Sequence, residues 1–361
     1  MKAHPTENLP MEPSYGTHSS PPRVGTALNG ALFSALRDDP RVILLGEDIV
    51  DPYGGAFKIT RGLSTAFPDR VRATPVSEAA IAGISAGLAL MGYRPIAEIM
   101  FGDFVSLAFD QIVNHIAKYE AMYDGQATCP VIIRFPSGGH RGYGPTHSQS
   151  LEKHLLGVPY LRVTALSAFV SPSQVLSHLL NSDAPTILVE HKLLYAEKLQ
   201  KVIDHRVGDL EARLEGSPGR LPTVGLSPVP AAECHITLVA YGYLASLAAR
   251  VIEELAIEEE FFVDLLVPAD LSWLDLDPIV RSVTTTGYLM TAEEGTEGFS
   301  WGSEVATRIT KACFHDLKGP VEVLTSAPAI IPSARQRERE VLMGRTQLLE
   351  ALRRYVEKGD L

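Results

Sequence analysis

The stretch TPVSEAAIAGISAGLALMGYRPIAEIMFGDF, from Thr74 to Phe104, decides how this chain folds. It predicts a loop, then a helix over Ala79 to Met91, then a short buried strand over Ile96 to Met100. Ser77 is a suitable N-cap, because its hydroxyl can accept a hydrogen bond from the first turn. The helix is almost wholly apolar and rich in alanine and glycine, so we expect it to be buried on most of its circumference.

Acidic residues occur at the start of the predicted helix and directly after a predicted strand. Glu78 stands at the start of the apolar helix, where it is either a solvated anion that complements the helix dipole or a partly buried group that hydrogen-bonds a ligand nitrogen. Glu47 and Asp48 follow the predicted strand Arg41 to Leu45, and open α/β sheets bind ligands beyond the carboxyl ends of their strands. The alternative for this second pair is a loop that faces water.

Composition excludes several classes of function. The 361 residues are 45% hydrophobic and 21% charged, values typical of a globular chain of two or three domains. A net charge of -11 argues against nucleic acid or an anionic membrane as a partner. The three cysteines (Cys129, Cys234 and Cys313) are far apart, which favours reduced thiols in a cytoplasm over disulfides or a zinc site. No apolar run reaches the roughly 20 residues of a membrane span, so we expect a soluble cytoplasmic protein.

Strands alternate with helices along most of the chain, which predicts the α/β class with two doubly wound domains. Residues 1–22 are rich in proline, serine, histidine and threonine and predict a mobile tail. Residues 23–201 form the first predicted domain and residues 235–361 the second, which ends in a helix over Glu340 to Val356. Between them, residues 202–234 break the alternation and predict an interdomain linker.

A long glycine-rich loop, RFPSGGHRGYGPTHSQS, follows the strand predicted over Val131 to Arg134. Loops of this length in compact domains are usually functional or disordered. His147 lies in this loop, and an imidazole can donate a proton near neutral pH. His140 is either a second polar group at a site or an exposed residue, and we favour the exposed position.

Three segments, PVSEAAIAG, GYRPIAEIMFGDF and GPTHSQSLE, together resemble one family. They are similar to the beta subunit of the E1 component of thiamine-diphosphate-dependent 2-oxoacid dehydrogenases, of the pyruvate and branched-chain complexes. The resemblance runs from about Arg41 to Tyr195 and returns more weakly from Ile236. It implies a pyrimidine-binding parallel-sheet domain followed by a domain like the transketolase C-terminal domain.

The resemblance also implies roles for five residues. Glu78 would hydrogen-bond the pyrimidine nitrogen opposite the amino group and favour the imino tautomer. Phe104 would pack on the pyrimidine, and Met100 is expected beside it. Glu47 would relay protons between two active sites. His147 would be catalytic and assist reductive acylation of the lipoyl group.

The chain lacks the GDG motif and the later Asn-Asn pair with which thiamine enzymes hold magnesium and the diphosphate. By resemblance, an alpha partner would supply both, with the cofactor across the interface of an α2β2 assembly. We therefore expect no metal site in this chain. The sequence NSDAP (181–185) replaces the DPNP-like pattern that binds an alkali metal in relatives, so we do not assign potassium.

Three functions remain open at this point. The first is an E1 beta subunit that, with its alpha partner, passes an acyl group from a 2-oxoacid to lipoyl-lysine of an E2 protein. The second is a specialised two-subunit acyl transferase or carboligase of biosynthesis, because PADLSWLDLDP (268–278) and residues 331–335 depart from the family pattern. The third is a catalytically silent subunit that only binds a partner.

Overall fold

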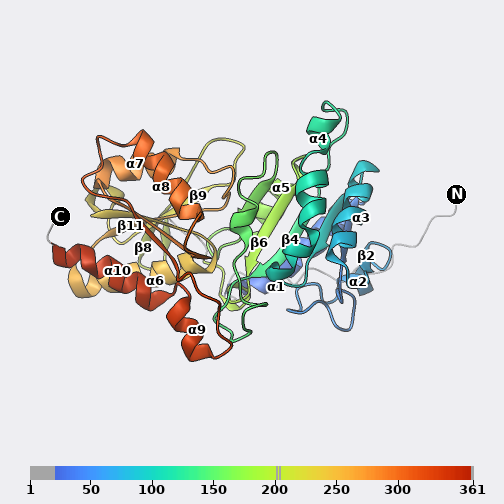
Figure 1. Cartoon of the computed structure of the whole chain (residues 1–361), viewed down its shortest axis with the longest axis horizontal. Helices are drawn as coiled ribbons and strands as arrows, with labels where there is room; N and C mark the ends of the chain where they lie inside the picture. Colours follow the sequence, from blue (N-terminus) through green and yellow to red (C-terminus); the bar gives the residue numbers. More distant parts are fainter. Residues whose placement is uncertain (1–20, 201, 203–204, 359–361) are drawn as a thin grey trace.

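The computed structural model describes residues 21–200, 202 and 205–358, so the predicted mobile tail lies almost wholly outside the described residues. Figure 1 shows two sheet-based domains side by side, with helices on the faces of each sheet. The predicted α/β class with two such domains is confirmed.

The first domain contains a six-stranded sheet in the order β2-β1-β3-β4-β6-β5, and every pair in it is parallel. Its strands are β1 (Val42–Gly46), β2 (Val71–Ala73), β3 (Arg94–Glu98), β4 (Ile132–Ser137), β5 (Arg162–Ala165) and β6 (Thr186–His191). Its α-helices are α1 (Val24–Asp38), α2 (Leu63–Ala66), α3 (Glu78–Leu90), α4 (Tyr119–Met122) and α5 (Pro172–Leu180). After β3 the chain forms a 3₁₀ helix, η1 (Gly102–Ala108), and a π-helix, η2 (Gln111–Ile116), before α4.

Helix α3 confirms one expectation and corrects another. The Ser77 hydroxyl accepts a hydrogen bond from the backbone N–H of Ala80, as predicted for an N-cap. The helix is not buried on most of its circumference, because Ile84 is 52% exposed and the C-cap residue Met91 75% exposed. Figure 1 shows α3 on the side of the first sheet away from the second domain. This chain therefore leaves an apolar face of α3 uncovered.

The second domain contains a seven-stranded mixed sheet in the order β13-β12-β10-β11-β9-β8-β7. Its strands are β7 (Arg206–Val207), β8 (Leu210–Glu215), β9 (Thr223–Ser227), β10 (Ile236–Ala240), β11 (Val263–Pro268), β12 (Leu289–Thr296) and β13 (Glu322–Ser326). Its helices are α6 (Gly242–Glu259), α7 (Asp277–Thr286), α8 (Trp301–Ala312), α9 (Arg335–Val341) and α10 (Arg345–Lys358). The single final helix predicted over 340–356 is thus two helices.

The linker predicted over residues 202–234 is wrong for most of its length. Strands β7, β8 and β9 lie in this segment and pair antiparallel to one another, and β9 pairs antiparallel to β11. Leu210 and Ala212 of β8 are buried, as are Val224 and Leu226 of β9, so alternate residues of each strand enter the core. The turn between β8 and β9 holds Gly216, Pro218, Gly219 and Pro222, so part of the irregular composition of this segment belongs to a turn between strands.

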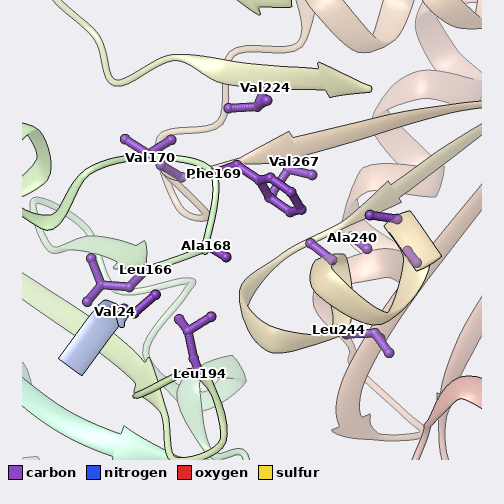
Figure 2. Close-up of a cluster of buried hydrophobic side chains, with 14 of the residues drawn as sticks. Val24, Leu166, Ala168, Phe169, Val170, Leu194, Val224, Ala240, Leu244 and Val267 are labelled. Carbon is purple, nitrogen blue, oxygen red and sulfur yellow. The ribbon is translucent and has the colours of Figure 1, made fainter. Parts of the chain in front are cut away.

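The two domains share one hydrophobic core. Figure 2 shows Phe169 of the first domain beside Val267 of the second, and both belong to a buried cluster that also includes Val24, Leu166 and Val224. Backbone hydrogen bonds also cross between the domains, as from the Ala165 N–H to the Ala269 carbonyl at 2.8 Å. The second domain therefore lies against the loops at the carboxyl edge of the first sheet.

None of the helices in the described part of the chain is long and apolar enough to cross a membrane.

Candidate active site

The carboxyl ends of the parallel strands bring several motifs to one edge of the first sheet. Glu47 directly follows β1, and Lys192 directly follows β6. Met100 lies two residues beyond β3, is half-buried and precedes Phe101. The glycine-rich loop that carries His147 follows β4. This edge is where open parallel sheets bind ligands.

Glu47 and Glu78 form a buried acidic pair, 4% and 5% exposed. Burial and the charge of Glu78 raise the pKa of Glu47, and a hydrogen bond from the Ser77 backbone opposes that rise. The Glu47 Oε1 atom is buried without a hydrogen-bond partner. Across the described ranges, no cation lies within salt-bridge distance of either carboxylate. Since a buried acceptor without a donor is costly, this pair fits a ligand that supplies N–H groups.

Aromatic rings form the wall beside His147. The centroid of the Phe104 ring lies 5.1 Å from that of His147, with the ring planes at 81°. Phe101 lies 4.8 Å from His147 and 5.8 Å from Phe104, again edge to face. The structure thus brings Phe104 and His147 together from segments more than 40 residues apart. Sequence reasoning missed Phe101, although it stands directly before the GDF sequence at residues 102–104.

The polar contacts of His147 are local. Its Nδ1 lies 3.0 Å from the hydroxyl of the neighbouring Thr146, and its backbone N–H donates to the Gly144 carbonyl at 3.4 Å. Gly144 has φ +80°, and a Cβ there would lie 2.6 Å from the Ser333 hydroxyl of the second domain. Only glycine suits both the backbone and the close approach.

The second domain holds the first half of the glycine-rich loop. Glu294 on β12 accepts from the Gly139 N–H at 2.6 Å, and Glu338 on α9 accepts from the Gly142 N–H at 2.8 Å. His140, expected to be exposed, is instead largely buried, with its Nε2 3.1 Å from the Met343 carbonyl. Figure 1 shows α9 reaching toward the first domain. The expectation failed because these partners lie more than 150 residues further along the chain.

A buried cation lies under the aromatic wall. The Lys192 ammonium donates to the Gly138 carbonyl and lies 5.7 Å from the centroid of the Phe101 ring. Burial lowers the pKa of Lys192 to about 8, against the attraction of Asp103 and Glu294. The strand-end rule that singled out Glu47 could have found Lys192, because EHK (190–192) closes β6. No group of three or more histidine, cysteine or acidic residues in the described ranges is arranged to hold a metal.

Two family models match this chain. The transketolase pyrimidine-binding domain matches residues 20–198, and the transketolase C-terminal domain matches residues 227–347. A pyruvate dehydrogenase E1 component subunit beta from Leifsonia xyli subsp. xyli is 36% identical, over 82% of this chain and 83% of that protein. This chain belongs to the E1 beta subunit family.

Further comparisons extend this result over the whole chain. The E1 beta chain is 32% identical to a 3-methyl-2-oxobutanoate dehydrogenase subunit beta from Mycobacterium tuberculosis, over 99% of its own length and 97% of the relative's. Among solved structures, a split-gene transketolase described as an inactive beta4 tetramer matches with a TM-score of 0.67 and 20% identity. That match covers 91% of the E1 beta chain and 96% of the transketolase chain, and it bears on the fold alone.

Proposed function

We propose that this chain supplies the pyrimidine-binding wall of a thiamine diphosphate site in a 2-oxoacid dehydrogenase. The observation that carries the proposal is the buried pair Glu47 and Glu78, which has no cation and leaves one acceptor atom unsatisfied. It lies at the same sheet edge as the rings of Phe104 and His147. Acid, aromatic and imidazole groups are the set that an aminopyrimidine and its reaction require.

When bound, thiamine diphosphate supplies the nucleophilic carbon that attacks and decarboxylates a 2-oxoacid. Glu78 would hydrogen-bond a ring nitrogen of the pyrimidine and share a proton with it. Glu47 would lie beside Glu78, where burial and the charge of Glu78 raise its pKa and favour its protonated form. Phe104 and Met100 would pack against the pyrimidine. His147 would donate a proton as the acyl group leaves for its acceptor.

An alpha subunit would hold magnesium and the diphosphate. Exposed apolar residues on α3, beside its two ends and on η1 support this partner: Val76, Ile84, Met91 and Leu107 are between 52% and 81% exposed. Helix α3 packs against η1, and large apolar side chains exposed on neighbouring elements are typical of a protein–protein interface. We propose an α2β2 assembly with activity only in the complex, and lipoyl-lysine of an E2 protein as acyl acceptor. The three buried free thiols support a cytoplasmic location.

The decisive assay reconstitutes the chain with its alpha subunit and offers the complex a 2-oxoacid together with either a lipoyl domain or an aldehyde acceptor. Acylation of the lipoyl domain supports the dehydrogenase. Product formed only with the aldehyde would favour the transferase or carboligase. Full turnover by both Glu78→Gln and His147→Ala would overturn the site assignment and favour a catalytically silent subunit.

A further inference from the structure

We propose that Asp103 and Gln149 form a positioning pair that holds His147 against Phe104; the inference rests on the proposed function. Asp103 is 6% exposed. Its Oδ1 accepts from the Gln149 backbone N–H at 3.1 Å and from the Gln149 side-chain amide at 2.9 Å. One carboxylate oxygen thus joins two segments that are 46 residues apart in sequence.

The two segments are those that carry the site. Asp103 lies in η1 between Phe101 and Phe104, whose rings both meet His147 edge to face. Gln149 lies two residues after His147. The bonds between Asp103 and Gln149 therefore set the distance between the imidazole and both aromatic rings.

The loop depends on such a tie because ordering its glycine-rich backbone costs conformational entropy. Gly138, His140, Gly142 and Gly144 all have positive φ, and glycine-rich backbone loses much conformational entropy when it is ordered. Contacts with the second domain hold the first half of the loop, at residues 139–142. The half that carries His147 has no polar side-chain contact with that domain before Ser150 among the described residues. Asp103 holds this second half.

Asp103 could instead take part in proton transfer, since its Oδ2 is buried without a partner. The two roles predict different behaviour for Asp103→Asn. An amide oxygen can replace Oδ1 as the acceptor of both bonds, whereas a carboxamide cannot exchange protons. A positioning role therefore predicts that Asp103→Asn keeps the two hydrogen bonds to Gln149 and the position of His147, whereas Asp103→Ala loses both.

The first measurement needs no activity. In the full chain labelled with ¹⁵N and ¹³C at histidine, the His147 ring signal, assigned by its loss in His147→Gln, is displaced by the ring currents of Phe101 and Phe104. We expect Asp103→Ala to move it toward the position of an exposed histidine, Gln149→Ala to move it part of the way, and Asp103→Asn to leave it in place. Thr237→Val is the matched control, because it removes buried hydroxyl contacts in the second domain. An unmoved signal in Asp103→Ala would overturn the inference.

The second measurement uses the reconstituted complex with its alpha subunit. We expect Asp103→Ala to lower kcat by up to about 10²-fold, as for a misplaced catalytic group, with a smaller change in KM. In a His147→Ala background, Asp103→Ala should cost nothing further, because Asp103 acts through His147. Two results would refute a positioning role. One is a shifted pH profile of kcat together with Asp103→Asn being as inactive as Asp103→Ala. The other is that the losses of kcat from Asp103→Ala and His147→Ala add up in the double variant. An inactive wild-type complex would contradict the proposed function and leave the spectroscopic result to decide the inference.

Discussion

Two pairs of buried glutamates lie at the same edge of the first sheet, and only one pair is neutralised. Glu98 on β3 and Glu190 on β6 flank Arg134 on β4, which binds Glu190 through two contacts of 2.7 Å and also binds Glu98. Burial opposes the charge of the guanidinium, but the two carboxylates together raise the pKa of Arg134. Glu47 follows β1, the strand next to β3, and among the described residues neither Glu47 nor Glu78 has such a cation.

The presence or absence of a cation distinguishes the two pairs: Glu98 and Glu190 have a structural role, whereas Glu47 and Glu78 are available to a ligand. A buried charge is tolerated when it is paired and hydrogen-bonded, and Glu190 also accepts from the Tyr195 hydroxyl at 2.6 Å. Glu47 retains an unsatisfied acceptor instead. We infer that Arg134 stabilises the sheet, whereas the pair without a cation serves binding and catalysis.

The largest expected effect comes from the pair without a cation. Glu78→Gln keeps the shape of the side chain and removes its ability to exchange a proton. We expect kcat of the reconstituted complex to fall toward the upper end of the 10²–10⁴-fold range of acid–base catalysis. Thermal unfolding of the variant should match the wild type. Normal turnover would show that the Glu47 and Glu78 pair does not serve catalysis.

Arg134→Met tests the paired glutamates. It leaves Glu98 and Glu190 buried beside each other without a cation, so we expect the free energy of unfolding to fall by about 3–5 kcal/mol. Urea unfolding of the purified chain measures the loss. Arg41→Met serves as the control, because its ion pair with Asp39 is exposed at the surface. Equal stability of both variants would show that Arg134 does not stabilise the sheet.

Glu152 offers an intermediate case. It lines a cavity of about 20 Å³ between the domains and accepts from the Tyr241 hydroxyl at 2.9 Å. Burial raises its pKa to about 7 from an ordinary value of 4.5. The folded chain therefore binds this proton more tightly than the unfolded chain, so its contribution makes the unfolding free energy fall as pH rises from about 4.5 to about 7. In Glu152→Gln, the decrease in unfolding free energy between pH 4.5 and 7 should be smaller than in the wild type by up to about 3 kcal/mol. Urea unfolding from about pH 4.5 to about pH 8 measures it. An unchanged pH dependence would contradict the raised pKa.

The smallest expected effect is that of Glu47→Gln. Because burial and Glu78 raise the pKa of Glu47, its contribution to stability falls as pH rises above the ordinary carboxyl value and stays low at neutral pH. We expect the variant to gain a small amount of stability at pH 7, because a buried glutamine carries no charge beside Glu78. Parallel unfolding at pH 4.5 and pH 7 measures the gain. A loss of stability at pH 7 would indicate a favourable partner for Glu47.

The sequence pattern predicted those helices and strands that are determined by residues a few positions apart. The strands predicted near residues 41–45, 96–100 and 131–134 correspond to β1, β3 and β4, and Ser77 caps α3, because burial patterns and capping residues act over a few positions. The edge strands β2 and β5 were not predicted, since each has only three or four residues. A strand end, a helix start and the long loop led to Glu47, Glu78 and His147, and the family resemblance added Phe104. The rings of Phe104 and His147 lie in direct contact.

The sequence by itself thus determined the alternation of elements and the segments that carry chemistry, because side-chain periodicity and turn residues act locally. Only the tertiary structure decided that residues 206–227 extend the second sheet, that His140 is held by Met343, and that Asp103 binds Gln149. It also decided which face of α3 this chain leaves open. These contacts join residues tens to hundreds of positions apart, and they depend on how two domains pack, which no short stretch of sequence encodes.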